Sequence, residues 1–124
     1  MQYDISKSPP FPCIRVEVGP LRGSASSIPN DAKVDTGAAG TIIPTRLAKQ
    51  LGLLPLGESV LVKAFDPSIP ARYLPAYYVI LAVGTTKMEL KVLAIQRSEV
   101  LLGRDVLNKL KLLLDGPSET LDIL

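Results

Sequence analysis

The residues whose types and spacing could carry chemistry gather around Asp35, in the segment AKVDTGA at positions 32–38. Small residues follow the aspartate, so the backbone can turn tightly there and leave the carboxylate accessible. The hydroxyl of Thr36 can form a hydrogen bond that fixes such a loop. An ordinary turn also contains Asp and Gly in these places. Taken alone, the Asp-Thr-Gly triplet therefore favours a turn over a catalytic loop.

The residue types that the chain lacks narrow the possible chemistry. The sequence has no histidine and a single cysteine, Cys13. A Ser-His-Asp triad, a Cys-His pair, a histidine metal site and a thiolate zinc cluster are therefore excluded. Any catalysis would use carboxylates, lysines, hydroxyls or backbone groups, and among these Asp or Glu is the natural acid-base group. We expect neither a metal nor another cofactor.

The composition describes an ordinary small domain. The chain has 124 residues, 47% of them apolar, and a formal net charge of +2 without a basic cluster, which gives no sign of a nucleic-acid surface. The longest apolar run, 77–83, is too short to cross a bilayer. The first residues do not resemble a secretory signal. We therefore expect a cytoplasmic protein with no nucleic-acid or membrane partner.

Short alternating segments dominate the predicted secondary structure. Strands are predicted at 13–18, 32–35, 41–44, 58–65, 73–83, 87–94, 99–102 and 110–114, with 120–124 as a further candidate. Residues 24–31 read as a polar loop or strand edge. Short helices are expected at 45–51, where Thr45 can cap the start and Gly52 the end, and at 105–109. This pattern predicts an all-β barrel or sandwich. Residues 1–12 are predicted to be a flexible N-terminal arm, and residues 13–124 a single domain.

A second segment, VLLGRDVLN at positions 100–108, changes the interpretation of the segment that contains Asp35. Together with AKVDTGA and the β-branched run TIIP at 41–44, it resembles the two signatures of the retropepsin-like aspartic peptidases, especially their small bacterial single-domain members. The resemblance covers roughly residues 13–124. It implies a closed acid-protease barrel with one or two short helices, and an aspartic-type endopeptidase.

The resemblance also implies a role for each matching residue of the first signature. Asp35 would be the catalytic carboxylate. Thr36 would direct its hydroxyl across a dimer axis and lock two such loops together. Gly37 would offer its carbonyl to the substrate backbone, and Ala38 would line the first specificity pockets.

The second signature would support that loop from behind. Leu101, Leu102 and Gly103 would form the supporting strand, and Arg104 and Asp105 would start the following helix. The alternative interpretation of Arg104 and Asp105 is an ordinary polar pair at the start of a helix.

Two departures from the family pattern stand out. Viral members often carry an acidic residue at the position of Ala39, with which the arginine pairs, so Arg104 must find another partner here. The substrate-covering flap would lie at 62–73, which contains no glycine, and its prolines make the tip stiffer. Residues expected to line the flap and pockets are Ile42, Phe65, Ile69 and Leu74.

The chemistry of this family requires two carboxylates that share one proton, whereas this chain carries one Asp-Thr-Gly. The simplest solution is a C2 homodimer acting on a peptide or protein substrate, with Asp35 of each chain meeting on the axis. The final strand at 121–124, together with the arm, could join an intermolecular sheet. It could equally pair within its own chain.

Two alternatives remain open at this point. The chain could be a retropepsin-fold dimer that cleaves weakly or not at all and serves as a peptide-binding or interaction module. It could also be a phosphoryl-transfer enzyme with Asp35 as nucleophile. Such enzymes usually place another acidic residue two positions on, where this chain has Gly37.

Overall fold

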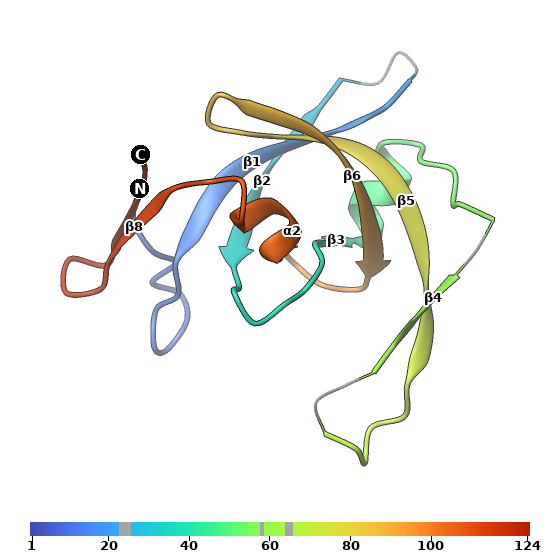
Figure 1. Cartoon of the computed structure of the whole chain (residues 1–124), viewed down its shortest axis with the longest axis horizontal. Coiled ribbons are helices and arrows are strands. Elements are labelled where there is room, and N and C mark those ends of the chain that lie inside the picture. The colour runs from blue at the N-terminus through green and yellow to red at the C-terminus, as the bar shows by residue number, and fades with distance from the viewer. Residues whose placement is uncertain (23–25, 58, 64–65) are drawn as a thin grey trace.

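The computed structural model describes residues 1–22, 26–57, 59–63 and 66–124. Six strands close into a barrel (Figure 1), in the order β1 (Cys13–Pro20), β2 (Ile28–Val34), β7 (Val100–Leu102), β3 (Ile42–Pro44), β6 (Thr86–Ile95) and β5 (Arg72–Val83). The ring closes because β5 pairs with β1 as well as with β6. The predicted all-β closed barrel is thereby confirmed.

The inward face of each strand fills the barrel. In β1, Ile14, Val16 and Val18 are buried, while the intervening Arg15 and Glu17 are exposed. Strand β6 alternates in the same way over its ten residues. A two-residue period of this kind places every second side chain in the core, and the removal of apolar surface from water drives the closure.

Strand β2 is longer than its sequence indicates. The polar stretch expected as a loop or strand edge at 24–31 enters the sheet at Ile28, which pairs with Val18 of β1. Backbone pairing along β1 is sufficient to hold Pro29 and Asp31 extended, although both side chains face outward. Residues 24 and 25 of this stretch lie outside the described ranges.

Two short helices complete the barrel domain, α1 (Thr45–Gln50) and α2 (Arg104–Leu107). The prediction that Thr45 caps α1 is wrong: Pro44 occupies the N-cap, no side chain bonds there, and Thr45 is the first helical residue. Gly52 follows the helix with φ +63°, a conformation that glycine adopts without strain. Neither helix, nor any other in the described ranges, is long and apolar enough to span a membrane.

A long hairpin projects from the barrel (Figure 1). Strand β4 (Ser59–Val62) pairs antiparallel with the first residues of β5, with Val60 opposite Leu74 and Leu61 opposite Tyr73. The hairpin occupies the region in which the sequence places a flap.

The end of the chain forms a separate two-stranded sheet from β8 (Leu112–Asp115) and β9 (Thr120–Ile123). The first residues, expected to be a loose arm, lie against the other edge of β9. The amide of Tyr3 donates to the carbonyl of Glu119, and the amide of Leu121 donates to the carbonyl of Met1, both at 2.8 Å. Strand β9 thus has both of its edges occupied within its own chain.

Leu121 ties this terminal sheet to the barrel core, since its side chain is fully buried there. We expect Leu121→Ala to lower the free energy of unfolding by about 2–5 kcal/mol, because it removes transfer energy and leaves a cavity. Urea unfolding at one fixed protein concentration measures the change. Leu54→Ala is the control, because Leu54 is 85% exposed. Equal effects of the two substitutions would contradict the packing of β9 in cis.

Candidate active site

The loop that contains Asp35 has to cross the end of another strand. Strand β7 lies between β2 and β3 in the sheet and pairs with both. The chain leaves β2 at Val34 and enters β3 at Ile42, so residues 35–41 pass over the carboxyl end of β7 (Figure 1). This topology brings the two sequence signatures into direct contact.

Asp35 stands at the beginning of this loop, half-buried. Its backbone amide donates to the carbonyl of Leu102 at 3.1 Å, and its own carbonyl accepts from the amide of Ala38 at 3.2 Å. The amide of Gly37 donates to Oδ1 of the carboxylate at 2.9 Å. The backbone is therefore fixed on both sides of a carboxylate that remains accessible.

The next three residues of the loop are partly or fully accessible. Thr36 and Gly37 are exposed, and Ala38 is half-buried. Their roles in dimer locking, substrate binding and pocket lining remain predictions.

Gly103 allows the crossing itself. A Cβ atom built on Gly103 would lie 2.6 Å from the backbone of Gly40, a separation that no side chain permits. Directly after it, the amide of Arg104 donates to the carbonyl of Ala38 at 2.9 Å, and that of Asp105 to the carbonyl of Ala39 at 3.3 Å. The start of α2 therefore supports the loop from behind with two backbone hydrogen bonds.

A buried polar network closes the far end of the loop. The Asp105 carboxylate accepts from the Thr41 hydroxyl at 2.8 Å and from the Thr41 amide at 3.1 Å. The hydroxyl oxygen of Thr41 in turn accepts from the amide of Gly103 at 3.1 Å. Thr41 is 1% exposed, so loss of either partner would leave a buried polar group unsatisfied. In the sequence, Thr41 is visible only as part of a β-branched run, because its partner Asp105 lies 64 positions away.

Arg104 forms its hydrogen bond with a group other than an acidic side chain at position 39, where this chain has Ala39. Its Nη1 donates to the carbonyl oxygen of Thr36 at 2.8 Å. Among the described residues, no carboxylate forms a salt bridge with it. Leu101 and Leu102 lie in β7, and the carbonyl of Leu102 accepts from the amide of Asp35.

The flap candidates are less uniform. Leu74 is buried and Ile69 is exposed, while Phe65 lies outside the described residues. The hairpin tip contains a turn in which the amide of Ser68 donates to the Asp66 carboxylate at 2.9 Å. Hydrogen bonds from Ser68 lower the pKa of the Asp66 carboxyl. Ile42, the remaining pocket candidate, is half-buried.

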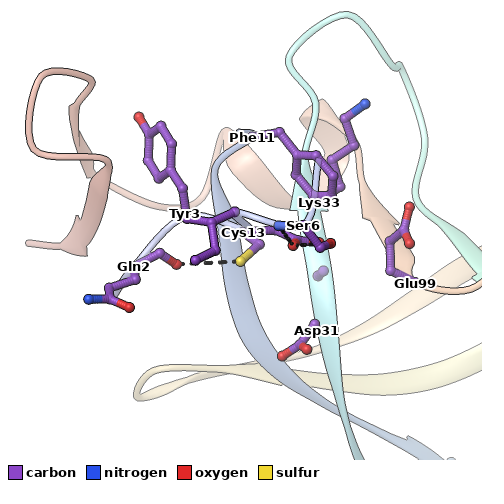
Figure 2. A pocket seen from close by; sticks show the side chains of 11 residues that line it. Gln2, Tyr3, Ser6, Phe11, Cys13, Asp31, Lys33 and Glu99 are labelled. Carbon is purple, nitrogen blue, oxygen red and sulfur yellow. Dashed lines mark hydrogen bonds between the residues drawn. The ribbon is translucent and has the colours of Figure 1, made fainter. Parts of the chain in front are cut away.

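A hollow lies away from the Asp35 loop, between the arm and strands β1 and β2 (Figure 2). Its volume is about 520 Å³, and its lining includes Cys13, Asp31 and Lys33 but not Asp35. The Cys13 thiol donates to the carbonyl of Gln2 at 3.5 Å, and burial raises the pKa of Cys13. A protonated, half-buried thiol is a poor nucleophile. The described residues contain no cluster of metal-ligating side chains.

Comparison with solved structures identifies the class of fold. The EIAV protease in complex with the inhibitor HBY-793 matches with a TM-score of 0.60 and 17% identity, over 88% of this chain and 93% of that one. The simian foamy virus (mac) protease matches with a TM-score of 0.56 and 21% identity, over 77% and 91%. The foamy viral protease-reverse transcriptase bound to an RNA/DNA hybrid matches at 0.61 and 22%, over 82% of this chain, which spans only 12% of that protein. The fold is that of a retroviral-type aspartic protease.

The sequence of the chain places it more narrowly. The model of the family described as gag-polyprotein putative aspartyl protease matches residues 23–109, a span that includes both signatures. The chain belongs to this family. A search of curated proteins finds no match. In the described ranges, strands do not alternate regularly with long helices, which is the arrangement that the phosphoryl-transfer alternative needs.

The crossing of Gly40 and Gly103 yields a direct test. We expect Gly103→Ala to lower the free energy of unfolding by about 1–3 kcal/mol, because the new methyl group forces two backbone segments apart. Urea unfolding monitored by circular dichroism measures the effect. Gly57→Ala is the matched control, since a Cβ atom at Gly57 meets nothing within 4 Å. A Gly103→Ala variant as stable as the control would contradict the close crossing.

Proposed function

We propose that the protein is an aspartic endopeptidase that hydrolyses peptide bonds with a water molecule activated between the Asp35 carboxylates of a homodimer. The observation that carries the proposal is the accessible Asp35 carboxylate, held by the amide of Gly37 at 2.9 Å on a loop supported by the second signature. The family membership supports the same class of chemistry.

The two carboxylates at the proposed site take different roles in the reaction. Close like charges cannot both ionise cheaply, so the pair holds one proton between them. The ionised member removes a proton from the water molecule, and the water oxygen attacks the scissile carbonyl carbon. The protonated member donates to the carbonyl oxygen as negative charge develops there. Transfer of a proton to the amide nitrogen then releases the amine, without a covalent intermediate.

The neighbouring residues take the supporting roles in this proposal. The exposed Thr36 hydroxyl locks the two loops across the axis, and the carbonyl of Gly37 binds the backbone of an extended substrate. Ala38 borders the first side-chain pockets. The β4–β5 hairpin covers the substrate and excludes water.

The second chain needs a surface on which to dock, and the edge of β8 fits this need. Within the described part of the chain, β8 pairs only with β9, whereas β9 already has both edges occupied. Leu113 and Leu114 of β8 are each 49% exposed. An open strand edge that carries exposed leucines is a ready template for a further strand. We therefore assign the intermolecular sheet to β8 rather than to 121–124.

The hydrogen-bonding pattern of β8 selects a register for this pairing. In an antiparallel ladder, the amide and carbonyl of one residue point to the same side, and successive residues alternate. The carbonyl of Lys111 accepts from the amide of Leu124, the residue after β9, at 2.8 Å. The polar backbone groups of Leu112 and Leu114 consequently point to the open edge. Pairing Leu112 with Leu114 of the partner subunit satisfies these groups in both chains.

The same register is complementary in charge. It places the Leu113 residues opposite each other on the two-fold axis, and Lys111 opposite Asp115 of the partner subunit. Opposite charges across two strands stabilise the pairing, and like charges in these positions oppose it. The pattern Lys-Leu-Leu-Leu-Asp at 111–115 is therefore self-complementary about its centre.

Asp35→Asn tests the catalytic assignment. We expect the cleavage rate to fall by about 10²–10⁴-fold, because the amide can neither accept nor donate the transferred proton. Cleavage of a mixed peptide library at mildly acid pH, followed by mass spectrometry, measures the loss. Asp31→Asn is the control, since Asp31 belongs to an exposed pair with Arg15. Equal cleavage by wild type and Asp35→Asn would refute the proposal.

Leu113→Asp tests the dimer interface. Two carboxylates would then face each other on the axis, and we expect the dissociation constant of the dimer to rise on the order of tenfold. Sedimentation equilibrium gives the constant, and circular dichroism checks that the barrel is intact. Leu54→Asp is the control on another exposed leucine. An unchanged dissociation constant for Leu113→Asp would exclude the β8 interface.

A second function is favoured by one feature, the glycine-free flap tip. If the tip cannot close productively, the same dimer would bind peptides without cleaving them. Binding of a transition-state-mimicking inhibitor by a wild-type protein that shows no turnover would favour this function. The cytoplasmic location remains a prediction.

A further inference from the structure

The peptide group between Thr36 and Gly37 is held at both ends. Its carbonyl oxygen accepts from Nη1 of Arg104 at 2.8 Å, and its N–H donates to Oδ1 of Asp35 at 2.9 Å. A peptide unit is planar, so an orientation imposed on the carbonyl is imposed on the N–H as well. The guanidinium group and the catalytic carboxylate are thereby connected through a single rigid group.

We propose that Arg104 is a positioning residue for the reaction, which orients the Asp35 carboxylate through the Thr36–Gly37 peptide. This inference deepens the proposed peptidase function and rests on it for its kinetic consequence. It assigns Arg104 a role beyond the start of a helix. Arg104 binds a carbonyl of the active-site loop instead of an acidic side chain at position 39, where this chain has Ala39.

The local backbone does little to fix this peptide. Glycine at position 37 tolerates almost any φ, so rotation of the Thr36–Gly37 peptide meets little resistance from the local backbone. The amides at the start of α2 hold the carbonyls of Ala38 and Ala39, but not that of Thr36. The guanidinium group of Arg104 supplies the hydrogen bond that is missing from this series.

Electrostatics act in the same direction. A cation that binds the carbonyl polarises the peptide, which strengthens the donation of its N–H to an anionic acceptor. With Oδ1 held in this way, rotation of the carboxylate about χ2 is restricted. The other oxygen is then directed consistently toward the water molecule and the second carboxylate, which is the form of preorganisation that catalysis requires.

The Gly37 amide provides a test that does not depend on activity. In ¹⁵N-labelled full-length protein, we expect Arg104→Ala to accelerate exchange of this amide with water by about tenfold, the loss expected for a charge-assisted hydrogen bond. Amides of the barrel core, such as Val16, should be unchanged. Arg104→Lys, which keeps a cationic donor, should give an intermediate rate. Arg15→Ala, at an exposed ion pair, should leave Gly37 unaffected.

Kinetics then test the catalytic consequence. We expect Arg104→Ala to lower kcat about ten- to a hundredfold, with a smaller change in KM. Added guanidinium ions should restore part of the lost rate in Arg104→Ala but not in Asp35→Asn. A residue that merely stabilised the fold would not show this rescue.

The outcomes separate the two proposals. Unchanged Gly37 exchange in Arg104→Ala would overturn the positioning role, whether or not the wild type cleaves peptides. Faster exchange with an unchanged kcat would also overturn it. Faster exchange in Arg104→Ala, together with a wild type that shows no turnover, would support the clamp and refute the peptidase function. If Arg104→Ala does not fold, the exchange rate and kcat of Arg104→Lys decide, and wild-type values for both would count against the proposal.

Discussion

At the crossing of Gly40 and Gly103, two backbone segments pass so closely that an added Cβ would lie 2.6 Å from its neighbour. The crossing follows from the sheet order, in which β7 separates the two strands that flank the Asp35 loop. Every contact that shapes the loop from behind starts at this point: the amides of α2, the Asp105 carboxylate and the Arg104 side chain. The geometry of the carboxylate therefore depends on a place where no side chain can fit.

Some parts of this arrangement are predictable from the sequence, and others are not. Strands such as β1 and β6 were predictable because one buried face imposes a two-residue period. The entry of β2 at Ile28 was not, since pairing with β1 overrides a polar sequence that suggests a loop. The bonds between Thr41 and Asp105 join residues 64 positions apart. No local pattern records such a contact, although the two signatures themselves are visible.

The terminal strands illustrate a different limit. Pairing of β9 within one chain or between two chains uses the same backbone hydrogen bonds, so the sequence left both arrangements open. A short turn between β8 and β9 makes the cis pairing intramolecular, which carries a much smaller entropic cost than association. Once β9 is paired on both edges within its own chain, β8 is the strand of this terminal sheet that keeps an open edge. In the proposed dimer, the pairing between subunits would then use β8 and the self-complementary segment 111–115.

In the proposed function the β4–β5 hairpin is the flap, and the turn at its tip limits how it can close. At its tip, the amide of Ile69 donates to the carbonyl of Asp66 at 3.0 Å, and the amide of Ser68 to the Asp66 carboxylate. Pro67 and Pro70 further restrict the backbone on both sides of this turn. A tip ordered in this way cannot reshape itself around a substrate as a glycine-rich tip can. In the proposed function, the hairpin would therefore move as one unit, and its exposed side chains, such as Leu61 and Tyr73, would determine selectivity.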